Sequence, residues 1–86
     1  MSSDSLEAQL KEMIVERLML KFKPEEIADE DDLIKKWGLE SVQLMEIVIG
    51  LEEVFGIQLG DDEFSVKKFR TIHNIAEVVR GKQAQG

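Results

Sequence analysis

The sequence predicts an all-α fold: a small four-helix bundle with three main helices, one short helix and a long first loop. Three stretches repeat their apolar residues with the period of an α-helix, and no stretch shows the sustained alternation of a strand. The chain has 86 residues, which suits one small domain and excludes a barrel or a doubly wound sheet. We therefore expect a single domain over residues 1–86, with residues 81–86 as a frayed tail.

The first helix is expected from about Ser5 to Phe22, where apolar residues recur at helical spacing. Asp4 and Glu7 have the spacing of a capping box at its start. Pro24 lacks a backbone N–H and prevents simple continuation of this helix.

The second helix is expected from Ser41 to Phe55, and Gly56 after it is typical of a helix C-terminus. The connection from Pro24 to about Glu40 is unusually long. It contains many acidic residues but also too many apolar residues for a free linker. We expect it to pack across the bundle.

A shorter element of one to two turns is expected around Glu63 to Lys68. Thr71 precedes a further amphipathic stretch and has the side chain of an N-cap, so the last helix is expected to begin there.

The composition excludes several functions. The chain has no cysteine, so it forms no disulfide, thiolate nucleophile or sulfur metal site. Its net charge of −7 would repel a phosphate backbone, so we expect no nucleic acid and instead partner proteins with basic patches. No apolar run is long enough to span a membrane and no signal pattern opens the chain, so the expected location is the cytoplasm.

The helix over residues 41–55 has two apolar faces when its residues are placed at about 100° intervals. One is an ordinary core stripe, formed by Leu44, Ile47, Val48, Leu51, Val54 and Phe55. The other is formed by Val42, Met45 and Ile49, with Glu46, Glu52 and Glu53 within or beside it. An apolar strip rimmed by acids can be a docking face for basic partners, or other helices can wrap it as core. Both interpretations remain open at this stage.

Ser41 stands at the start of that helix. A serine there can be a simple N-cap. Alternatively, its hydroxyl can carry a phosphodiester, because first-turn N–H groups and the helix dipole favour an anion. It is not placed as a catalytic nucleophile, because the one histidine is His73 in the last helix and no nucleophile elbow surrounds the serine.

Two acidic runs, Asp29 to Asp32 and Asp61 to Glu63, raise the alternative of calcium binding. An EF-hand loop needs glycine at its sixth position, where these runs have Ile34 and Val66. We therefore expect solvated loop acids and no metal site.

The residues from Gly38 to Val42 read Gly-Leu-Glu-Ser-Val, and the helix that follows ends in Leu-Glu-Glu-Val-Phe at Phe55. This pattern closely resembles the acyl carrier proteins, in which the motif is Gly-x-Asp-Ser-Leu and the helix ends in Leu-Glu-Glu-x-Phe. The resemblance extends over almost the whole chain. It implies a carrier without catalytic residues of its own.

The resemblance implies that a separate phosphopantetheinyl transferase (a holo-carrier synthase), using magnesium, attaches 4′-phosphopantetheine from coenzyme A to Ser41. The thiol of this arm would hold acyl intermediates as thioesters for acyl-transferring, condensing and reducing enzymes of fatty acid, polyketide or related lipid biosynthesis. The expected carrier is a monomer. Its expected docking residues are Glu40, Val42, Met45, Glu46, Ile49, Glu52 and Glu53. The expected lining of an acyl chain is Ile47, Val48, Leu51, Phe55, Ile72 and Ile75.

The chain departs from the family pattern at several positions. Glu40 replaces the usual aspartate, Val42 replaces leucine, and Gln43 replaces a common acid. The segment from Lys67 to Arg70 is unusually basic, and its role is not indicated by the sequence. A dedicated carrier of a specialised pathway is therefore as consistent with the sequence as the main fatty-acid carrier. A peptidyl or D-alanyl carrier on the same arm, and a helical adaptor that is never modified, are the remaining alternatives.

Overall fold

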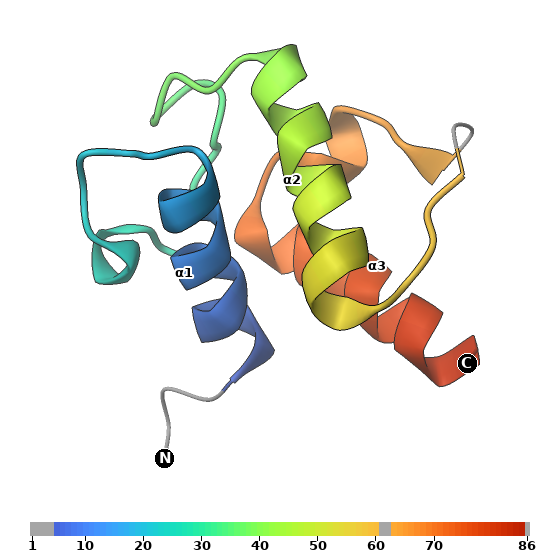
Figure 1. Cartoon of the computed structure of the whole chain (residues 1–86). Coiled ribbons are helices and arrows are strands. Elements are labelled where there is room, and N and C mark those ends of the chain that lie inside the picture. Colours follow the sequence, from blue (N-terminus) through green and yellow to red (C-terminus); the bar gives the residue numbers. More distant parts are fainter. Residues whose placement is uncertain (1–4, 61–62, 86) are drawn as a thin grey trace.

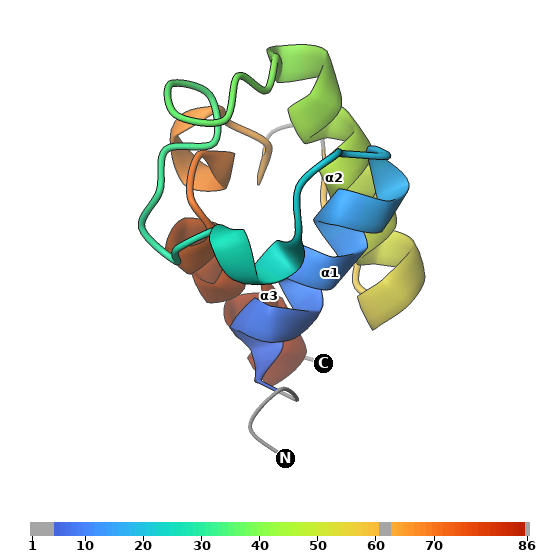
Figure 2. The ribbon, with the colours of Figure 1, turned by 90° about the vertical axis from the view of Figure 1, so that its left-hand side faces the viewer.

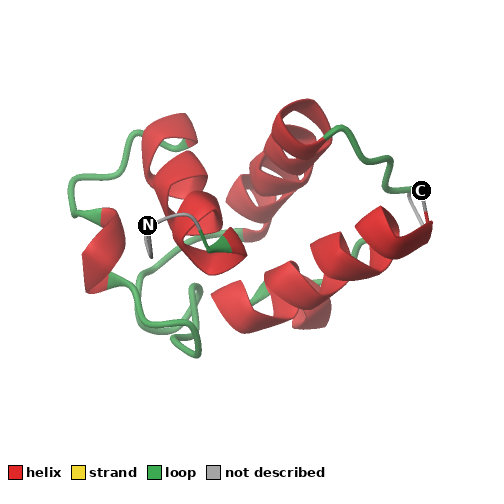
Figure 3. Cartoon of the chain, turned by 90° about the horizontal axis from the view of Figure 1, so that it is seen from below, coloured by secondary structure: helices red, strands yellow, loops and turns green. Residues whose placement is uncertain are grey.

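The computed structural model describes residues 5–60 and 63–85. Within these ranges its regular secondary structure is helical, the helices are joined by loops, and there is no strand (Figures 1 and 3). The predicted small helical bundle is thus confirmed. None of the helices in these ranges is long and apolar enough to cross a bilayer. The helical elements in chain order are α1 (Leu6–Arg17), the 3₁₀ turn η2 (Pro24–Glu26), α2 (Ser41–Phe55), the 3₁₀ turn η4 (Lys67–Phe69) and α3 (Ile72–Gln85).

The start of α1 is capped by Ser5, whose Oγ accepts a hydrogen bond from the Ala8 N–H at 3.1 Å. The expected capping box depended on Asp4, which lies outside the described residues.

The predicted C-terminal end of the first helix at Phe22 is wrong, because α1 ends at Arg17. Met19 adopts the left-handed conformation with φ of 54°. The N–H groups of Met19 and Leu20 then donate to carbonyls of the last helical turn, at 3.2 and 3.0 Å. This pair of bonds is the Schellman pattern, which closes a helix by satisfying its last carbonyls.

The predicted bounds of the second helix are confirmed, since α2 runs from Ser41 to Phe55. Gly56 adopts φ of 67°, a left-handed conformation that glycine reaches without a steric penalty. Its N–H donates to the Glu52 carbonyl at 3.0 Å. Sequence and structure agree here because both ends of α2 are determined locally.

The chain after α2 differs from expectation at two places. In place of the short helix expected around residues 63–68, the described chain has 3₁₀ conformation at Glu63 and the 3₁₀ turn at Lys67–Phe69. The frayed tail expected at residues 81–86 is wrong for 81–85, because α3 continues to Gln85, while residue 86 lies outside the described part. An interior glycine lowers helix stability by only about 1 kcal/mol, and Lys82 forms an ion pair with Glu63 that favours the last turns. Thr71 caps α3 as predicted, accepting from the Asn74 N–H at 3.0 Å.

The core is formed by side chains of all three helices and of both connections. All of the buried side chains in the described part are apolar. The long first loop contributes Ile27, Leu33 and Leu39 to this core, so it packs across the bundle as predicted.

The first loop lies beside the start of α3, far away in sequence (Figure 2), and hydrogen bonds join the two segments. The Leu33 N–H donates to the Arg70 carbonyl at 2.7 Å, and the His73 N–H donates to the Asp29 carbonyl at 2.8 Å. The Arg70 Nε donates to Asp32 at 2.9 Å. These contacts fix the loop that leads the chain into α2.

Candidate functional site

Ser41 is the first helical residue of α2, and the N-cap is Glu40. The backbone carbonyl of Glu40 accepts hydrogen bonds from the N–H groups of Gln43 and Leu44 at 2.9 and 3.1 Å. The backbone N–H of Glu40 donates to Gln43 Oε1 at 2.9 Å. Ser41 is exposed, and its hydroxyl forms no hydrogen bond with any described residue. The interpretation of Ser41 as an N-cap is therefore wrong, and its hydroxyl is available for other chemistry.

The backbone around Ser41 suits an anion. The amides of Ser41 and Val42 find no acceptor among the described residues, as expected of the first turn of a helix. These N–H groups lie at the positive end of the α2 dipole. Gly38 precedes them with φ of 76°, a conformation that turns the loop towards α2 and that a side chain would strain.

The acids of the first loop are used for structure. Asp31 accepts from the Ala28 N–H at 2.9 Å and from Trp37 Nε1 at 3.1 Å. The Ala28 hydrogen bond is the largest of the effects that lower the pKa of Asp31. Asp32 accepts from the Lys35 and Ile34 N–H groups at 2.8 and 2.9 Å, and the Lys35 bond is the main cause of its lowered pKa.

The second acidic run overlaps the residues that the structure does not describe, since Asp61 and Asp62 are among them. Glu63 pairs with Lys82 and accepts a hydrogen bond from the Gly60 N–H at 2.8 Å. The hydrogen bond with Lys82 makes the largest contribution to the lowered pKa of Glu63. Across residues 5–60 and 63–85 no group of three or more acidic or histidine side chains could hold a metal ion.

The second apolar stripe of α2 is exposed. The exposed fractions of Val42, Met45 and Ile49 are 65%, 43% and 40%. The interpretation of this stripe as core is therefore wrong. Val54, expected in the core stripe, is also exposed at 58%, because the described elements leave its side of the helix end uncovered.

The acids around this stripe differ in their contacts. Glu40 is exposed and forms no ion pair with a described residue. Glu46 and Glu53 both pair with Arg17 of α1. Glu52 accepts a hydrogen bond from the Leu59 N–H at 2.9 Å and thereby holds the chain that follows α2. The negative charge around this stripe is thus partly engaged within the chain at Glu46, Glu52 and Glu53.

The residues expected to line an acyl chain meet in one cluster. Ile47, Leu51, Ile72 and Ile75 are completely buried, and Val48 is buried as well. Phe55 is half-buried and packs against the same core. The structure therefore brings these six side chains from α2 and α3 into or against a single apolar core.

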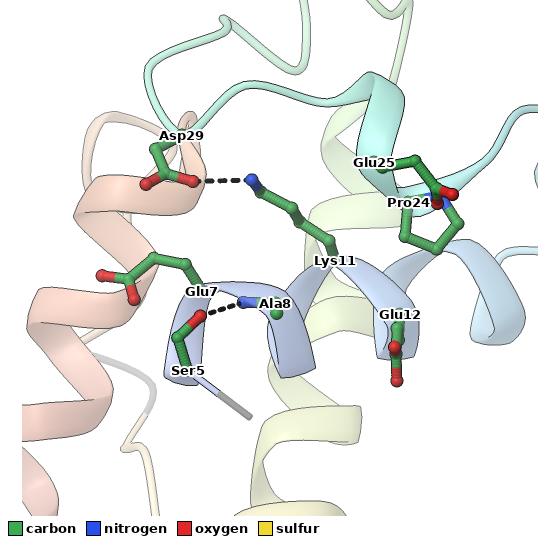
Figure 4. Close-up of a pocket in the computed structure, with 8 residues that line it drawn as sticks. All are labelled: Ser5, Glu7, Ala8, Lys11, Glu12, Pro24, Glu25 and Asp29. Atoms are coloured by element: carbon green, nitrogen blue, oxygen red, sulfur yellow. Dashed lines mark hydrogen bonds and ion pairs between the residues drawn. The ribbon is translucent and has the colours of Figure 1, made fainter. Parts of the chain in front are cut away.

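A separate hollow lies between α1 and η2, and Figure 4 shows eight of the residues that line it. Lys11 Nζ and Asp29 Oδ1 lie 2.7 Å apart across it. Glu7 Oε2 is paired with Arg80 at 2.9 Å, and Glu12 points away from the Lys11–Asp29 pair (Figure 4). Lys11, Asp29 and Glu7 are thus paired within the chain, and the described residues that line this hollow form no apolar stripe of the kind found on α2, so the N-terminus of α2 remains the candidate site.

The sequence analysis did not predict two features of α2. One is the pairing of Arg17 with Glu46 and Glu53, and the other is the close approach of α1 at Gly50. A glycine inside an otherwise apolar helix is the signal that could have revealed the second, because it often marks a close approach. No comparable signal connects Arg17 to its two acids.

Comparison with known proteins identifies the family of the chain. A family model described as the phosphopantetheine attachment site matches residues 8–79. The acyl carrier protein of Wolinella succinogenes is 31% identical over 70 residues, which cover 81% of this chain and 87% of the relative. The chain belongs to the acyl carrier protein family. The acyl carrier protein of Desulforapulum autotrophicum is 32% identical over 78 residues, covering 91% and 97% of the two chains.

The membership confirms the resemblance seen in the motif around Ser41 and in the end of α2. The cofactor of this carrier is 4′-phosphopantetheine, held covalently, and a carrier domain of this kind interacts with partner enzymes. An exposed hydroxyl beside first-turn amides, none of them bonded to a described residue, fits a phosphodiester of this kind.

Proposed function

We propose that this carrier holds acyl intermediates as thioesters on a 4′-phosphopantetheine arm attached to Ser41 Oγ. The observation that carries the proposal is the hydroxyl of Ser41, which lies at the exposed N-terminus of α2 and forms no hydrogen bond with a described residue. When bound, the arm supplies a terminal thiol, which this cysteine-free chain lacks. The chain itself supplies the attachment oxygen and amides that favour the phosphodiester, and it acts as a carrier rather than as a catalyst.

The proposed partners are a phosphopantetheinyl transferase and the acyl-transferring, condensing and reducing enzymes of fatty acid, polyketide or related lipid biosynthesis. They would dock on the exposed face of α2, formed by Val42, Met45 and Ile49. Glu40, Glu46, Glu52 and Glu53 lie around it as an acidic rim. Attraction between a basic patch and a carrier of charge −7 speeds encounter, while the small apolar stripe keeps each complex short-lived.

The proposed site of an acyl chain is between α2 and α3. Its lining would be Ile47, Val48, Leu51, Phe55, Ile72 and Ile75, which share one apolar core. Because these side chains already pack against one another, an entering chain has to displace them slightly.

The test is intact mass after incubation with coenzyme A and a phosphopantetheinyl transferase. The wild-type chain is expected to gain the mass of one phosphopantetheine, and Ser41→Ala is expected to gain none. Ser65→Ala is the matched control and is expected to be fully modified, because Ser65 lies outside the motif.

The fold of Ser41→Ala is checked by circular dichroism and urea unfolding. We expect a change of less than about 0.5 kcal/mol, since the hydroxyl caps no backbone group and surface substitutions of this kind are usually small. Arm attachment to Ser41→Ala would assign the site to another residue. A wild-type chain that gains no mass would favour the unmodified adaptor.

A further inference from the structure

Helix α1 approaches α2 closely at Gly50, which is buried. A Cβ atom at Gly50 would lie 2.7 Å from Met13 Sδ and 2.8 Å from Arg17 Cδ. The aliphatic stem of Arg17 therefore lies directly against the α2 backbone. Its Nε is buried and forms no hydrogen bond with a described residue. The guanidinium is held in place by packing as well as by charge.

The same guanidinium lies between two acids of α2. Arg17 Nε is 3.6 Å from Glu46 Oε1, and Arg17 Nη1 is 3.2 Å from Glu53 Oε1. Glu46 and Glu53 stand one turn before and about one turn after Gly50, so they share its face of the helix. Both carboxylates remain more than half exposed, whereas 73% of the Arg17 side chain is covered.

This arrangement divides the acids of the docking face. One positive charge stands among two negative ones near the middle and C-terminal part of α2, whereas Glu40 beside Ser41 is in no ion pair with a described residue. A basic group approaching Glu46 or Glu53 also meets the fixed charge of Arg17. Because the stem of Arg17 is packed against Gly50, this residue cannot swing away without uncovering the contact.

We infer that Arg17 is a specificity-determining residue of the docking face: by pairing with Glu46 and Glu53 it directs the basic patch of a phosphopantetheinyl transferase to the end of α2 that bears Glu40 and Ser41. This inference rests on the proposed function. Complementary charge favours this partner over an acidic one, because the carrier has a net charge of −7.

The principal experiment compares Arg17→Met with Arg80→Met. Both variants remove one positive charge and keep an unbranched apolar side chain. Arg80 is the matched control because it lies on α3 and forms an ion pair, at 2.9 Å, with Glu7 of α1. The association rate constant with the transferase is measured by stopped-flow at several salt concentrations. Arg17→Met is expected to associate severalfold faster than Arg80→Met at low salt, with a steeper salt dependence, and the two are expected to converge at high salt.

Arg17→Lys separates charge from packing. It keeps the positive charge, so its association rate is expected to match the wild type, and a rate like that of Arg17→Met would overturn the inference. Equal rates for Arg17→Met and Arg80→Met, or slower association of Arg17→Met, would also overturn it.

A second comparison does not depend on how Arg17 variants fold. Glu40→Gln is expected to slow association more than Glu46→Gln, since only the second carboxylate is already paired. Equal slowing by the two variants contradicts the inference. The mass measurement distinguishes failure of the proposed function from failure of this inference. A chain that accepts no arm refutes the proposed function. Full modification, with equal association rates of the compared variants, refutes only the role of Arg17.

Discussion

The buried and the exposed faces of α2 are built from the same kinds of aliphatic side chain. Leu44, Ile47 and Leu51 on one face are completely buried. Val42 and Met45 on the other are 65% and 43% exposed. Aliphatic composition therefore does not decide which face becomes core. Coverage by other elements decides it: α1 packs on α2 at Gly50, whereas the described elements leave the stripe of Val42, Met45 and Ile49 open to solvent.

The largest expected effect tests this difference at two adjacent positions. Leu44→Ala is expected to lower the free energy of unfolding by about 2–5 kcal/mol, because it opens a cavity in a packed core. Met45→Ala is expected to cost less than about 1 kcal/mol, because much of its side chain is already in water. Urea unfolding measures both. Similar losses for the two variants would mean that the exposed face is covered in solution.

A smaller effect is expected at two helical glycines. Gly50→Ala gains about 1 kcal/mol of helix propensity but inserts a methyl group against Met13 and Arg17, and overpacking costs about 1–3 kcal/mol. The expected net result is a loss of up to about 2 kcal/mol.

Gly81→Ala is the matched control, because no atom of a described residue lies within 4 Å of its added Cβ. It is expected to stabilise α3 by about 0.5–1 kcal/mol. Thermal unfolding of both variants gives the comparison, and a stabilising Gly50→Ala would contradict the close approach of α1.

The smallest effect is expected from an acyl chain loaded on the arm. A chain that enters the buried face between α2 and α3 binds only the folded state and is expected to raise the melting temperature by a few degrees. The gain is small because Ile47 and Ile75 already fill the core and have to shift. The control is the carrier with the arm alone. An unchanged melting temperature with a long acyl chain would place the cargo in solvent.

Local signals in the sequence predicted several elements well. The bounds of α2 follow from its apolar period and from Gly56, and the start of α3 follows from the capping hydroxyl of Thr71. The end of α1 was predicted five residues too far along the chain. Met19 adopts the left-handed conformation that ends the helix, and this position is usually occupied by glycine, which would have been visible in the sequence. The helical extension to Gln85 was missed because Gly81 and the short tail suggested fraying.

By itself the sequence determined the fold class, the family motif and the two apolar faces of α2, because each depends on residues within a few turns of one another. It also placed Ser41 at the helix start. The structure was needed to show that Glu40 is the N-cap and that the Ser41 hydroxyl forms no hydrogen bond with a described residue.

Only the tertiary structure decided which face of α2 is exposed and which of its acids are already paired. Arg17 and Glu53 are 36 residues apart, and no periodicity relates positions at that separation. Their contact follows from the packing of α1 on Gly50, and such packing is settled by shape and burial over the whole chain rather than by any local pattern.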